Sequence, residues 1–500
     1  MACLLGIDIG TSSLKVQIIK ETGIVIAESS RKYKFNIPLN GYAEQDPYVW
    51  WRACCEAIRE SIQRAGIRPE NINAVGLSGQ MHGTVVLDKN QNVIRPVIIH
   101  CDARSSKQCK DIETTLGKER LKNLVMNPVF SGFMLPTLLW IRENEPWNYE
   151  KIKYLLLPKD FIRLKLTGNM ASEYSDASAT LLFDITGGKW SQQLLNIFKI
   201  EENILPAVFG STELAGSVTR KASEETGLAL DTPVVYGGGD QIMQAIGNGV
   251  ITDGSATVNI GSSSQVCFPS SVTKVNPEVN SNLFCGYRQN HWIAMAASMS
   301  AGLSLTWFTS MFNNIDLAVL NEEILNIKPG SGGVIFLPYL GGERSPHLNP
   351  DLSGSFMGIT HGTTRYHLAR AIMEGTTFAL NDCMNICLKM GLKADLLVAS
   401  GGGAKSEPWL HMLADVFKVP LRMAINKEQA SLGAAIVAGV GCGVFGSVEE
   451  GCRAAVQYEE RIIVPKPSNH EIYLNYYQLF KEAFQGQVTV IEKLTKMGRQ

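Results

Sequence analysis

The sequence predicts an α/β protein built from two related domains that face each other across a cleft. Short apolar runs alternate with amphipathic stretches, which indicates strands alternating with helices. At 500 residues the chain is too long for one core, so we expect two domains of roughly 200–250 residues each. Residues 260–264 repeat the pattern of residues 9–13, in which an apolar strand leads to a glycine, a run of hydroxyl residues and a returning strand. We therefore predict one domain over 1–246 and a second over 247–500.

Periodicity places the elements of each half in chain order. The first half is expected to hold strands at 4–8, 14–19, 25–28, 74–77, 84–87 and 233–236, with helices at 46–65 and 242–246. The second half is expected to hold strands at 256–260, 265–268 and 396–399, a helix at 407–417, and a closing helix at 470–486 with Ile472, Tyr476, Leu479, Phe480 and Ala483 on its buried face. The apolar stretch 434–446 is interrupted by glycines and is short, which predicts a buried helix and loop.

Composition and charge exclude several classes of partner. The 45% hydrophobic and 19% charged residues are typical of a globular protein rather than a disordered one. A net charge of −1 provides no attraction to nucleic acid or to an anionic membrane. The eleven cysteines form no C-x-x-C pair, which indicates reduced thiols. With no basic leader and no apolar run of about 18–20 residues, we expect a soluble, cytoplasmic protein.

The strongest local motif is the first hydroxyl-rich turn, at residues 6–13. A glycine in a tight hairpin lets backbone N–H groups approach phosphate oxygens, and the hydroxyls of Thr11 and Ser12 add donors. Asp8, at the end of the strand, could hold a hydrated Mg²⁺ ion beside those phosphates. The alternative is an ordinary β-hairpin with polar turn residues.

The second copy of this turn contains Gly261 and Ser262 and differs from the first at one chemically important position. Asn259 stands where the first copy has Asp8. One metal-binding carboxylate is enough, because a second would repel the phosphates. The duplication favours the phosphate-binding interpretation over the ordinary hairpin.

A second motif places an acidic side chain directly after three glycines, at residues 237–239. The glycines let another molecule approach the backbone, and Asp240 then lies at the mouth of a buried strand, where α/β sheets bind ligands. A carboxylate at that point could take the proton of a hydroxyl that attacks phosphorus. The alternative is that Asp240 caps the following helix, and the two roles are compatible.

Two further turns have the composition of binding loops. The glycine-rich strand-to-helix turn at 400–404 suits a nucleotide, but it matches neither G-x-x-x-x-G-K-[ST] nor G-x-G-x-x-G. The turn at 79–83 places Gln80 and His82 where a small polar substrate could bind. A lone histidine in a turn also has a structural explanation, and Asp46 could simply cap its helix.

Taken together, these segments resemble the FGGY family of carbohydrate kinases, whose members share the duplicated actin/Hsp70/hexokinase fold, also called ribonuclease H-like. The resemblance runs from about residue 4 to residue 441. It is carried by residues 354–359 and 367–374, which follow the C-terminal signature of the family, and by residues 336–346.

The resemblance implies a reaction and a set of site residues. The reaction is transfer of the γ-phosphoryl group of ATP, with Mg²⁺, to a terminal hydroxyl of a small sugar, with Asp240 as the base. A homodimer is a further expectation. The implied site comprises Met81, His82 and Gln241 at the sugar, Asp8 at Mg²⁺, Thr11, Ser12, Gly261 and Ser262 at the phosphates, and Gly402, Gly403 and Ala404 at the adenosine.

Within the family, the pairing of residues 44–47 with residues 79–83 looks most like the members that phosphorylate xylulose, which implies D-xylulose as the substrate. Four positions depart from the pattern of those members. Gln241 replaces an asparagine, His100 and Cys101 replace a Trp-Asn pair, and Thr137 replaces a lysine.

The departures leave other functions open. The nearest alternative is another kinase of the same family, acting on ribulose, glycerol, gluconate or a similar polyol. A different class is an ATP-driven conformational switch without sugar kinase activity. A third is a catalytically inactive binding protein, against which the presence of both Asp8 and Asp240 argues.

Overall fold

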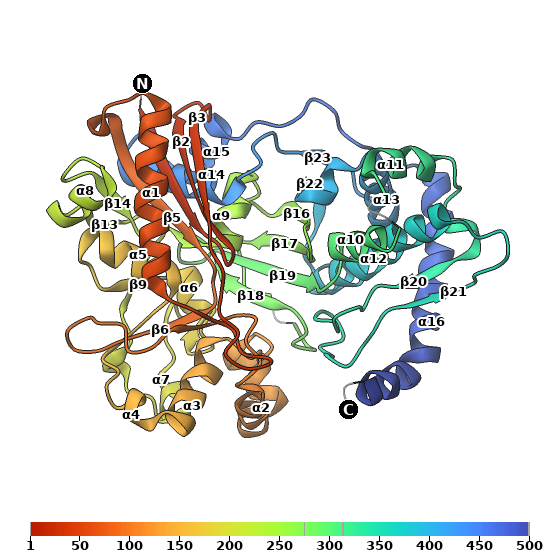
Figure 1. The fold of residues 1–500 in the computed structure, drawn as a ribbon, viewed down its shortest axis with the longest axis horizontal. Helices are drawn as coiled ribbons and strands as arrows, with labels where there is room; N and C mark the ends of the chain where they lie inside the picture. The colour runs from red at the N-terminus through yellow and green to blue at the C-terminus, as the bar shows by residue number, and fades with distance from the viewer. Residues whose placement is uncertain (1, 275, 313–314, 499–500) are drawn as a thin grey trace.

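The computed structural model describes residues 2–274, 276–312 and 315–498. Each half of the chain builds its own β-sheet, and the two sheets form the cores of two lobes (Figure 1). The first sheet has the order β13 (Leu214–Ser217), β14 (Pro233–Val235), β5 (Ile72–Gly79), β1 (Cys3–Ile9), β2 (Ser13–Lys20) and β3 (Val25–Lys32), with β15 (Gly238–Gly239) also paired to β5. The second has the order β18 (Asn282–Cys285), β19 (Trp292–Ser298), β17 (Ser264–Ser270), β16 (Gly254–Ile260), β22 (Ala394–Ser400) and β23 (Leu421–Met423).

The pairing of the strands confirms the predicted duplication. β1 is antiparallel to β2 and parallel to β5, while β16 is antiparallel to β17 and parallel to β22. The two hairpins close one residue apart, because Gly10 N–H donates to the Ser13 carbonyl over 3.0 Å, whereas Gly261 N–H donates over 2.9 Å to the carbonyl of Ser263, one residue before the equivalent of Ser13. The five-residue repeat in the sequence thus marks equivalent points of two related sheets.

The remaining elements surround these sheets. In the first lobe they are β4 (Glu44–Gln45), α1 (Pro47–Ala65), β6 (Gly83–Leu87), β7 (Val97–Ile99), α2 (Ser106–Arg120), α3 (Met134–Asn144), α4 (Pro146–Tyr149), β8 (Tyr154–Leu156), α5 (Pro158–Thr167), β9 (Ala171–Glu173), α6 (Tyr174–Ser178), β10 (Phe183–Asp184), β11 (Lys189–Trp190), α7 (Gln192–Phe198), β12 (Ala207–Phe209), α8 (Arg220–Thr226) and α9 (Asp240–Gly247). From the second half of the chain come α10 (Gly302–Ser310), α11 (Leu317–Leu325), β20 (Ile335–Leu337), β21 (Ser355–Met357), α12 (Arg365–Lys389), α13 (Glu407–Phe417), α14 (Gln429–Gly441), α15 (Val448–Ala455) and α16 (Pro467–Gly498).

Helix α1 begins and ends where its sequence predicts. Asp46 is its N-cap, and its carboxylate accepts the N–H of Tyr48 over 2.9 Å, while Pro47 supplies a first helical residue that needs no N–H partner. Gly66 ends the helix with φ of 62°, a left-handed conformation that glycine adopts without steric cost. The predicted capping role of Asp46 is therefore confirmed.

Helix α14 belongs to the second half of the chain but packs on the first sheet. Figure 1 shows α14 and α15 beside β2 and β5, away from the second sheet. A Cβ atom at Gly6, Gly76 or Gly247 would lie 1.9, 1.8 and 1.8 Å from backbone carbonyl oxygens of α14, so the helix rests directly on the backbones of β1, β5 and α9. The division at 246/247 stays a prediction about the boundary, and the packing adds that this helix crosses back over it.

One apolar cluster is shared by both halves. It is formed by side chains of β1, β5, α9 and α14 together with side chains of β17, β18 and β19. The members from the second sheet are Cys267, Phe284, Ile293 and Met295. Helices α9 and α14 therefore fill the space between the two sheets, and the halves share a core at their junction.

The closing helix differs from its prediction in length and orientation. Helix α16 runs from Pro467 to Gly498, and the predicted buried face is wrong at Ile472 and Leu479, which are 38% and 47% exposed. Tyr473 is buried instead, because its hydroxyl accepts a 2.8 Å hydrogen bond from Arg370 of α12. Among the described residues, no helix has both the length and the apolar character needed to cross a membrane.

The contact between α14 and the first sheet yields a stability prediction. Gly76→Ala forces a methyl group against an α14 carbonyl 1.8 Å away, and we expect a loss of about 3 kcal/mol or more in unfolding free energy. Gly486→Ala in α16 is the matched control, because no atom lies within 4 Å of its added Cβ. Urea unfolding of both variants measures the difference, and equal stabilities would contradict the close contact.

Candidate functional site

Two acidic side chains lie at the same end of the first sheet: Asp8 is on β1, Asp240 begins the helix that follows β15, and both strands pair with β5. In the strand register Asp8 of β1 is opposite Ser78 of β5, and Ser78 is opposite Gly238 of β15. The Ser78 hydroxyl donates to Asp8 Oδ1 over 2.8 Å. Asp240 follows Gly238 by two residues, so the sheet brings the two predicted acidic residues to the same edge.

The charge of Asp8 acts on Asp240. Burial and the nearby charge of Asp8 together raise the pKa of Asp240 to about 7. Burial also raises the pKa of Asp8, although the Ser78 hydrogen bond and the charge of Lys15 oppose the increase. Two partly desolvated acids at one end of the sheet form a site of negative potential, which the charge of Lys15 offsets only in part at Asp8.

The capping role considered for Asp240 is wrong. Strand β15 continues through Gly239, so Gly239 is the N-cap of α9 and Asp240 is the first helical residue. Its carboxylate bonds instead to the backbone and side chain of Gln241, and these bonds only partly offset the rise in its pKa. Asp240 therefore keeps a fixed place without serving as the cap.

The first hydroxyl-rich turn is supported by two buried glutamines. Gln45 donates through Nε2 to the Thr11 carbonyl over 2.6 Å, and the Thr11 hydroxyl donates to Gln80 Oε1 over 3.3 Å. Gln80 in turn donates to Gln45 Oε1 over 3.3 Å. Gln80, expected near a polar substrate, thus holds the turn that contains Thr11 and Ser12.

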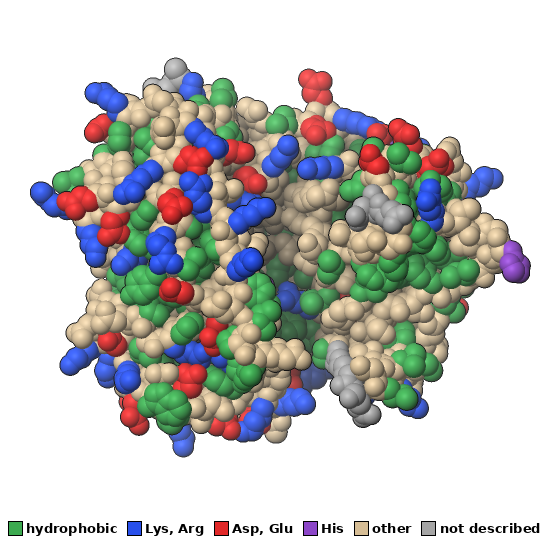
Figure 2. Space-filling model, in the orientation of Figure 1, with side chains coloured by type: hydrophobic (Ala, Val, Ile, Leu, Met, Phe, Trp, Pro, Cys, Tyr) green, Lys and Arg blue, Asp and Glu red, His purple; other side chains and the backbone are tan. Residues whose placement is uncertain are grey.

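The second turn is held by the start of α10 and faces the same region. The N–H of Ala301 donates to the Ser262 carbonyl and the N–H of Gly302 to the Gly261 carbonyl, each over 2.9 Å. Gln265, on the returning strand β17, makes a close hydrogen bond to the side-chain oxygen of Gln241 in α9. The second hairpin therefore lies against the helix that begins at Asp240, and Figure 2 shows the surface hollowed between the lobes.

A cavity of about 550 Å³ lies beside the glycine-rich turn of the second half. Gly402 and Ala404 line it, whereas a Cβ at Gly403 would meet Ile260 at 2.5 Å, so Gly403 packs on β16. Glu428 also lines the cavity, and it pairs with Lys15 of β2 over 2.5 Å. This ion pair links the cavity to the strand that follows the first hydroxyl-rich turn.

Met81 and His82 lie beside β15, the strand that precedes Asp240. Met81 is buried, and a Cβ at Gly239 would be 2.5 Å from its Cγ. His82 stacks on Phe133 with ring centroids 3.8 Å apart, and burial lowers its pKa well below the ordinary value. His82 Nδ1 is buried and has no hydrogen-bond partner among the described residues, which fits a position that a ligand would contact.

Sequence reasoning missed Arg344, which reaches this pocket from the second half. Its guanidinium lies 5.8 Å from the ring centre of Phe130 in the first half. Its positive charge also helps burial lower the pKa of His100 to about 4. Arg344 belongs to a segment that carries the family resemblance, but nothing in its sequence context indicated that it would face His82 and His100.

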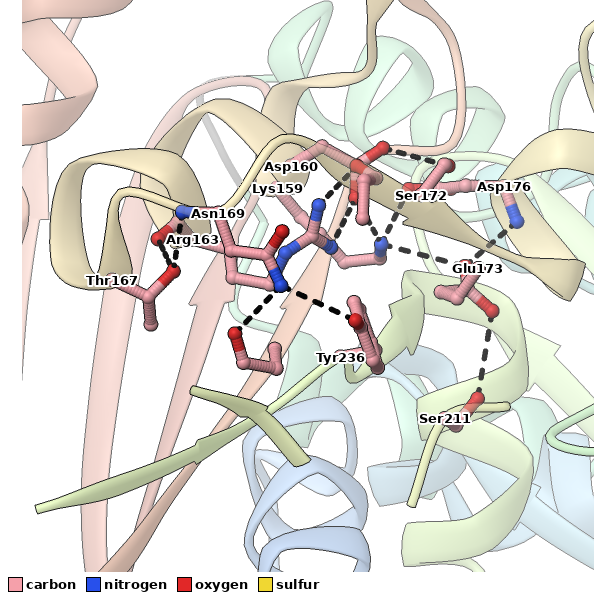
Figure 3. Close-up of polar contacts among 12 residues, drawn as sticks. Lys159, Asp160, Arg163, Thr167, Asn169, Ser172, Glu173, Asp176, Ser211 and Tyr236 are labelled. Atoms are coloured by element: carbon pink, nitrogen blue, oxygen red, sulfur yellow. Dashed lines mark hydrogen bonds and ion pairs between the residues drawn. The ribbon is translucent and has the colours of Figure 1, made fainter. Parts of the chain in front are cut away.

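Sequence reasoning also missed a cluster of charged side chains near β15, the strand that precedes Asp240 (Figure 3). The Lys159 ammonium lies 2.8 Å from Asp160, 3.4 Å from Glu173 and 3.1 Å from Asp176, and the Arg163 guanidinium lies 2.7 Å from Asp160. All five side chains are fully buried. In sequence they resemble ordinary surface charges, so only the fold could reveal them.

Three features define the class of protein. They are the paired ribonuclease H-like sheets, the two hydroxyl-rich hairpins and the nucleotide-sized cavity. The arrangement is the two-domain architecture of the sugar kinases related to actin and hexokinase.

Comparison with known proteins identifies the family within that class. Residues 3–247 match the model of the N-terminal domain of the FGGY family of carbohydrate kinases, and residues 251–442 match the model of its C-terminal domain. The chain belongs to the FGGY family of carbohydrate kinases.

Individual relatives cover nearly the whole chain. The chain is 37% identical to a xylulose kinase of Staphylococcus epidermidis, over 96% of each protein. It is 34% identical to a xylulose kinase of Lactococcus lactis, over 100% of this chain and 99% of that one. A crystal structure described as a xyloylose kinase from Brucella ovis has a TM-score of 0.91 at 30% identity and covers 98% of this chain and 100% of that one.

The raised pKa of Asp240 predicts a pH-dependent cost to stability. Because its pKa is about 7 in the folded state and about 3.9 in an unfolded chain, ionisation opposes folding increasingly from about pH 4 up to pH 7. Asp240→Asn should therefore raise the Tm by roughly 2–4 °C at pH 8 and by less at pH 5. The control is Asp111→Asn, which removes a carboxylate from an exposed position of α2. Calorimetry measures the Tm. If Asp240→Asn raises the Tm no more at pH 8 than at pH 5, the raised pKa of Asp240 is contradicted.

Proposed function

We propose that the protein transfers the γ-phosphoryl group of ATP to a terminal hydroxyl of a ketopentose, with D-xylulose as the first candidate and D-xylulose 5-phosphate as the product. The observation that carries this proposal is the pair Asp8 and Asp240 at one sheet edge, beside the Met81–His82 turn. The full-length similarity to proteins described as xylulose kinases supports the choice of sugar.

Asp240 is the proposed base. A pKa of about 7 lets a carboxylate be ionised near neutral pH and still be basic enough to accept a hydroxyl proton. The bonds from Gln241 hold the carboxylate in place before the acceptor arrives. Proton removal would accompany attack of the sugar oxygen on the γ-phosphorus.

The two hydroxyl-rich turns are the proposed phosphate site. Thr11 and Ser12 from the first turn and Ser262 from the second would donate hydrogen bonds to the triphosphate, while Gly261, without a side chain, would let the phosphates approach the second turn. The adenosine would occupy the cavity lined by Gly402 and Ala404, which are linked to the first lobe through the Lys15–Glu428 pair.

Asp8 is the proposed ligand of Mg²⁺. Among the described residues there is no cluster of three metal-ligating side chains, but Mg²⁺ at phosphoryl-transfer sites needs only one or two carboxylates beside the phosphates. The uncompensated pair of Asp8 and Asp240 fits that requirement. When bound, the ion would supply positive charge to the phosphate oxygens.

The sugar is proposed to bind between His82 and Asp240. The unpartnered Nδ1 of His82 would hydrogen bond a sugar oxygen, and its neutral imidazole can either donate or accept. Arg344 would approach the same sugar from the second lobe. Closure of the lobes would then exclude water, which competes as phosphoryl acceptor.

We further infer a cytoplasmic enzyme, because all eleven cysteines lie in described residues and none forms a disulfide. A homodimer remains part of the proposal, to be tested by analytical ultracentrifugation.

Replacing the proposed base tests the mechanism. Asp240→Ala should lower kcat by about 10²–10⁴-fold, because a positioned base typically contributes that much. The KM for ATP should change little, since the proposed nucleotide cavity lies in the other lobe. A variant that kept more than about a tenth of wild-type kcat would rule out Asp240 as the base.

A panel of acceptors tests the substrate. We expect sugar-dependent ADP release to be fastest with D-xylulose, compared with ribulose, glycerol and gluconate at equal concentrations. His100 and Cys101 depart from the pattern of xylulose-phosphorylating members and face Arg344, which keeps another sugar or polyol as the second candidate. ATP turnover that no sugar stimulates would instead favour the conformational switch.

A further inference from the structure

The buried charge cluster of Figure 3 reaches β15, the strand that ends at Gly239, through Ser175 next to Glu173. The N–H of Gly239 donates to the Ser175 hydroxyl oxygen over 2.8 Å, and a Cβ at Gly238 would lie 3.3 Å from the same oxygen. Gly239 immediately precedes Asp240 and is the N-cap of α9, with no side chain of its own to fix it. We propose that Ser175 is a positioning residue, which sets the direction of the Asp240 carboxylate by holding Gly239. The inference rests on the proposed role of Asp240 as the base.

The hydrogen bonds of Ser175 have a defined direction. Its hydroxyl donates to Glu173 Oε1 over 2.7 Å, so the hydroxyl proton points to Glu173. A hydroxyl has one proton, which leaves its oxygen lone pairs facing Gly239 N–H. The carboxylate therefore orients the hydroxyl, and the hydroxyl orients the backbone.

Glu173 is itself held on several sides. Its carboxylate accepts the backbone N–H groups of Ser175 and Asp176, each over 2.8 Å, at the start of α6. The Lys159 ammonium lies 3.4 Å away and also pairs with Asp160 and Asp176. Because these groups are fully buried, moving any of them leaves a desolvated charge without its partner, which is costly. The cluster is a rigid support.

The same cluster also supports the strand beside Gly239. Gly239 is opposite Gly79 in the β15–β5 pairing, and a Cβ at Gly79 would lie 2.9 Å from Lys159 Cβ. The lysine side chain therefore packs directly under the strand that precedes the Met81–His82 turn. Lys159 pairs at its ammonium with Glu173 and packs at its stem against Gly79, so one residue links both strands that frame the proposed acceptor site.

A purely structural role predicts a different outcome, and the chain offers a matched comparison. Ser172 is also fully buried and donates to Asp160 Oδ2 over 2.8 Å in the same cluster (Figure 3). Ser175→Ala and Ser172→Ala each remove one buried hydroxyl from the cluster. Only the first removes the acceptor of the Gly239 N–H.

The experiment measures kcat, both KM values, the pH profile of kcat and the Tm of full-length wild type, Ser175→Ala and Ser172→Ala. The acceptor is whichever panel sugar the wild type phosphorylates fastest. We expect Ser175→Ala to lower kcat by about 10-fold or more, because small displacements of a reacting group are costly. KM should change less than about twofold, and the acid limb of the kcat profile should shift, because loss of the anchor changes the surroundings of Asp240. Ser172→Ala should keep kcat within about twofold of wild type and an unchanged profile.

The outcomes separate this inference from the proposed function. The positioning role would be overturned if the wild type shows sugar-dependent turnover and both serine variants lose it equally. It would also be overturned if Ser175→Ala lowers the Tm but leaves kcat and the pH profile unchanged. A wild type without sugar-dependent turnover would overturn the proposed function itself. If Ser175→Ala does not fold, Ser175→Cys decides, because a thiol of similar size is a weak acceptor and should reproduce the fall in kcat.

Discussion

The structure depends on a backbone-to-backbone contact between its halves. Helix α14 is reached late in the chain, yet it rests on β1, β5 and α9 so closely that glycine is required on all three. Contact at this distance leaves no room for sliding, because interiors are close-packed and a single added carbon must displace backbone. Asp8 and Asp240 stand on β1 and α9, so the contact that joins the halves also fixes the floor of the site.

The charged side chains near the site lie in two layers, one below the strands and one above them. Below the strands, Lys159 and Arg163 are surrounded by carboxylates, and burial raises the pKa of Asp176 well above its ordinary value. Above the strands, Asp8 and Asp240 lie at the same end of the sheet, and the charge of Lys15 partly offsets the rise in the pKa of Asp8. The ion pairs around Lys159 make the lower layer rigid. The carboxylates of Asp8 and Asp240 give the upper layer a negative electrostatic potential, which a metal ion and a hydroxyl proton would reduce.

Family membership and acceptor choice rest on different residues. The sheets, turns and acidic pair are features of the whole carbohydrate kinase class, and they fit many acceptors. The pocket wall next to His82 is built from His100, Cys101 and Arg344, two of which replace residues typical of the xylulose-phosphorylating members. An arginine that arrives from the opposite lobe couples acceptor contact to the relative position of the lobes.

The sequence by itself determined the α/β class, the duplication, and the positions of Asp8 and Asp240, because glycine-rich turns and apolar periodicity are local properties of a chain. It did not determine whether Asp240 would cap α9 or be its first residue, because β15 runs through Gly239 and makes that glycine the N-cap. Only the tertiary structure decided where α14 packs, which face of α16 is buried, and which charged side chains gather around Lys159. Those features join residues far apart in sequence, and a charge that becomes buried looks, in a linear sequence, like one that remains in water.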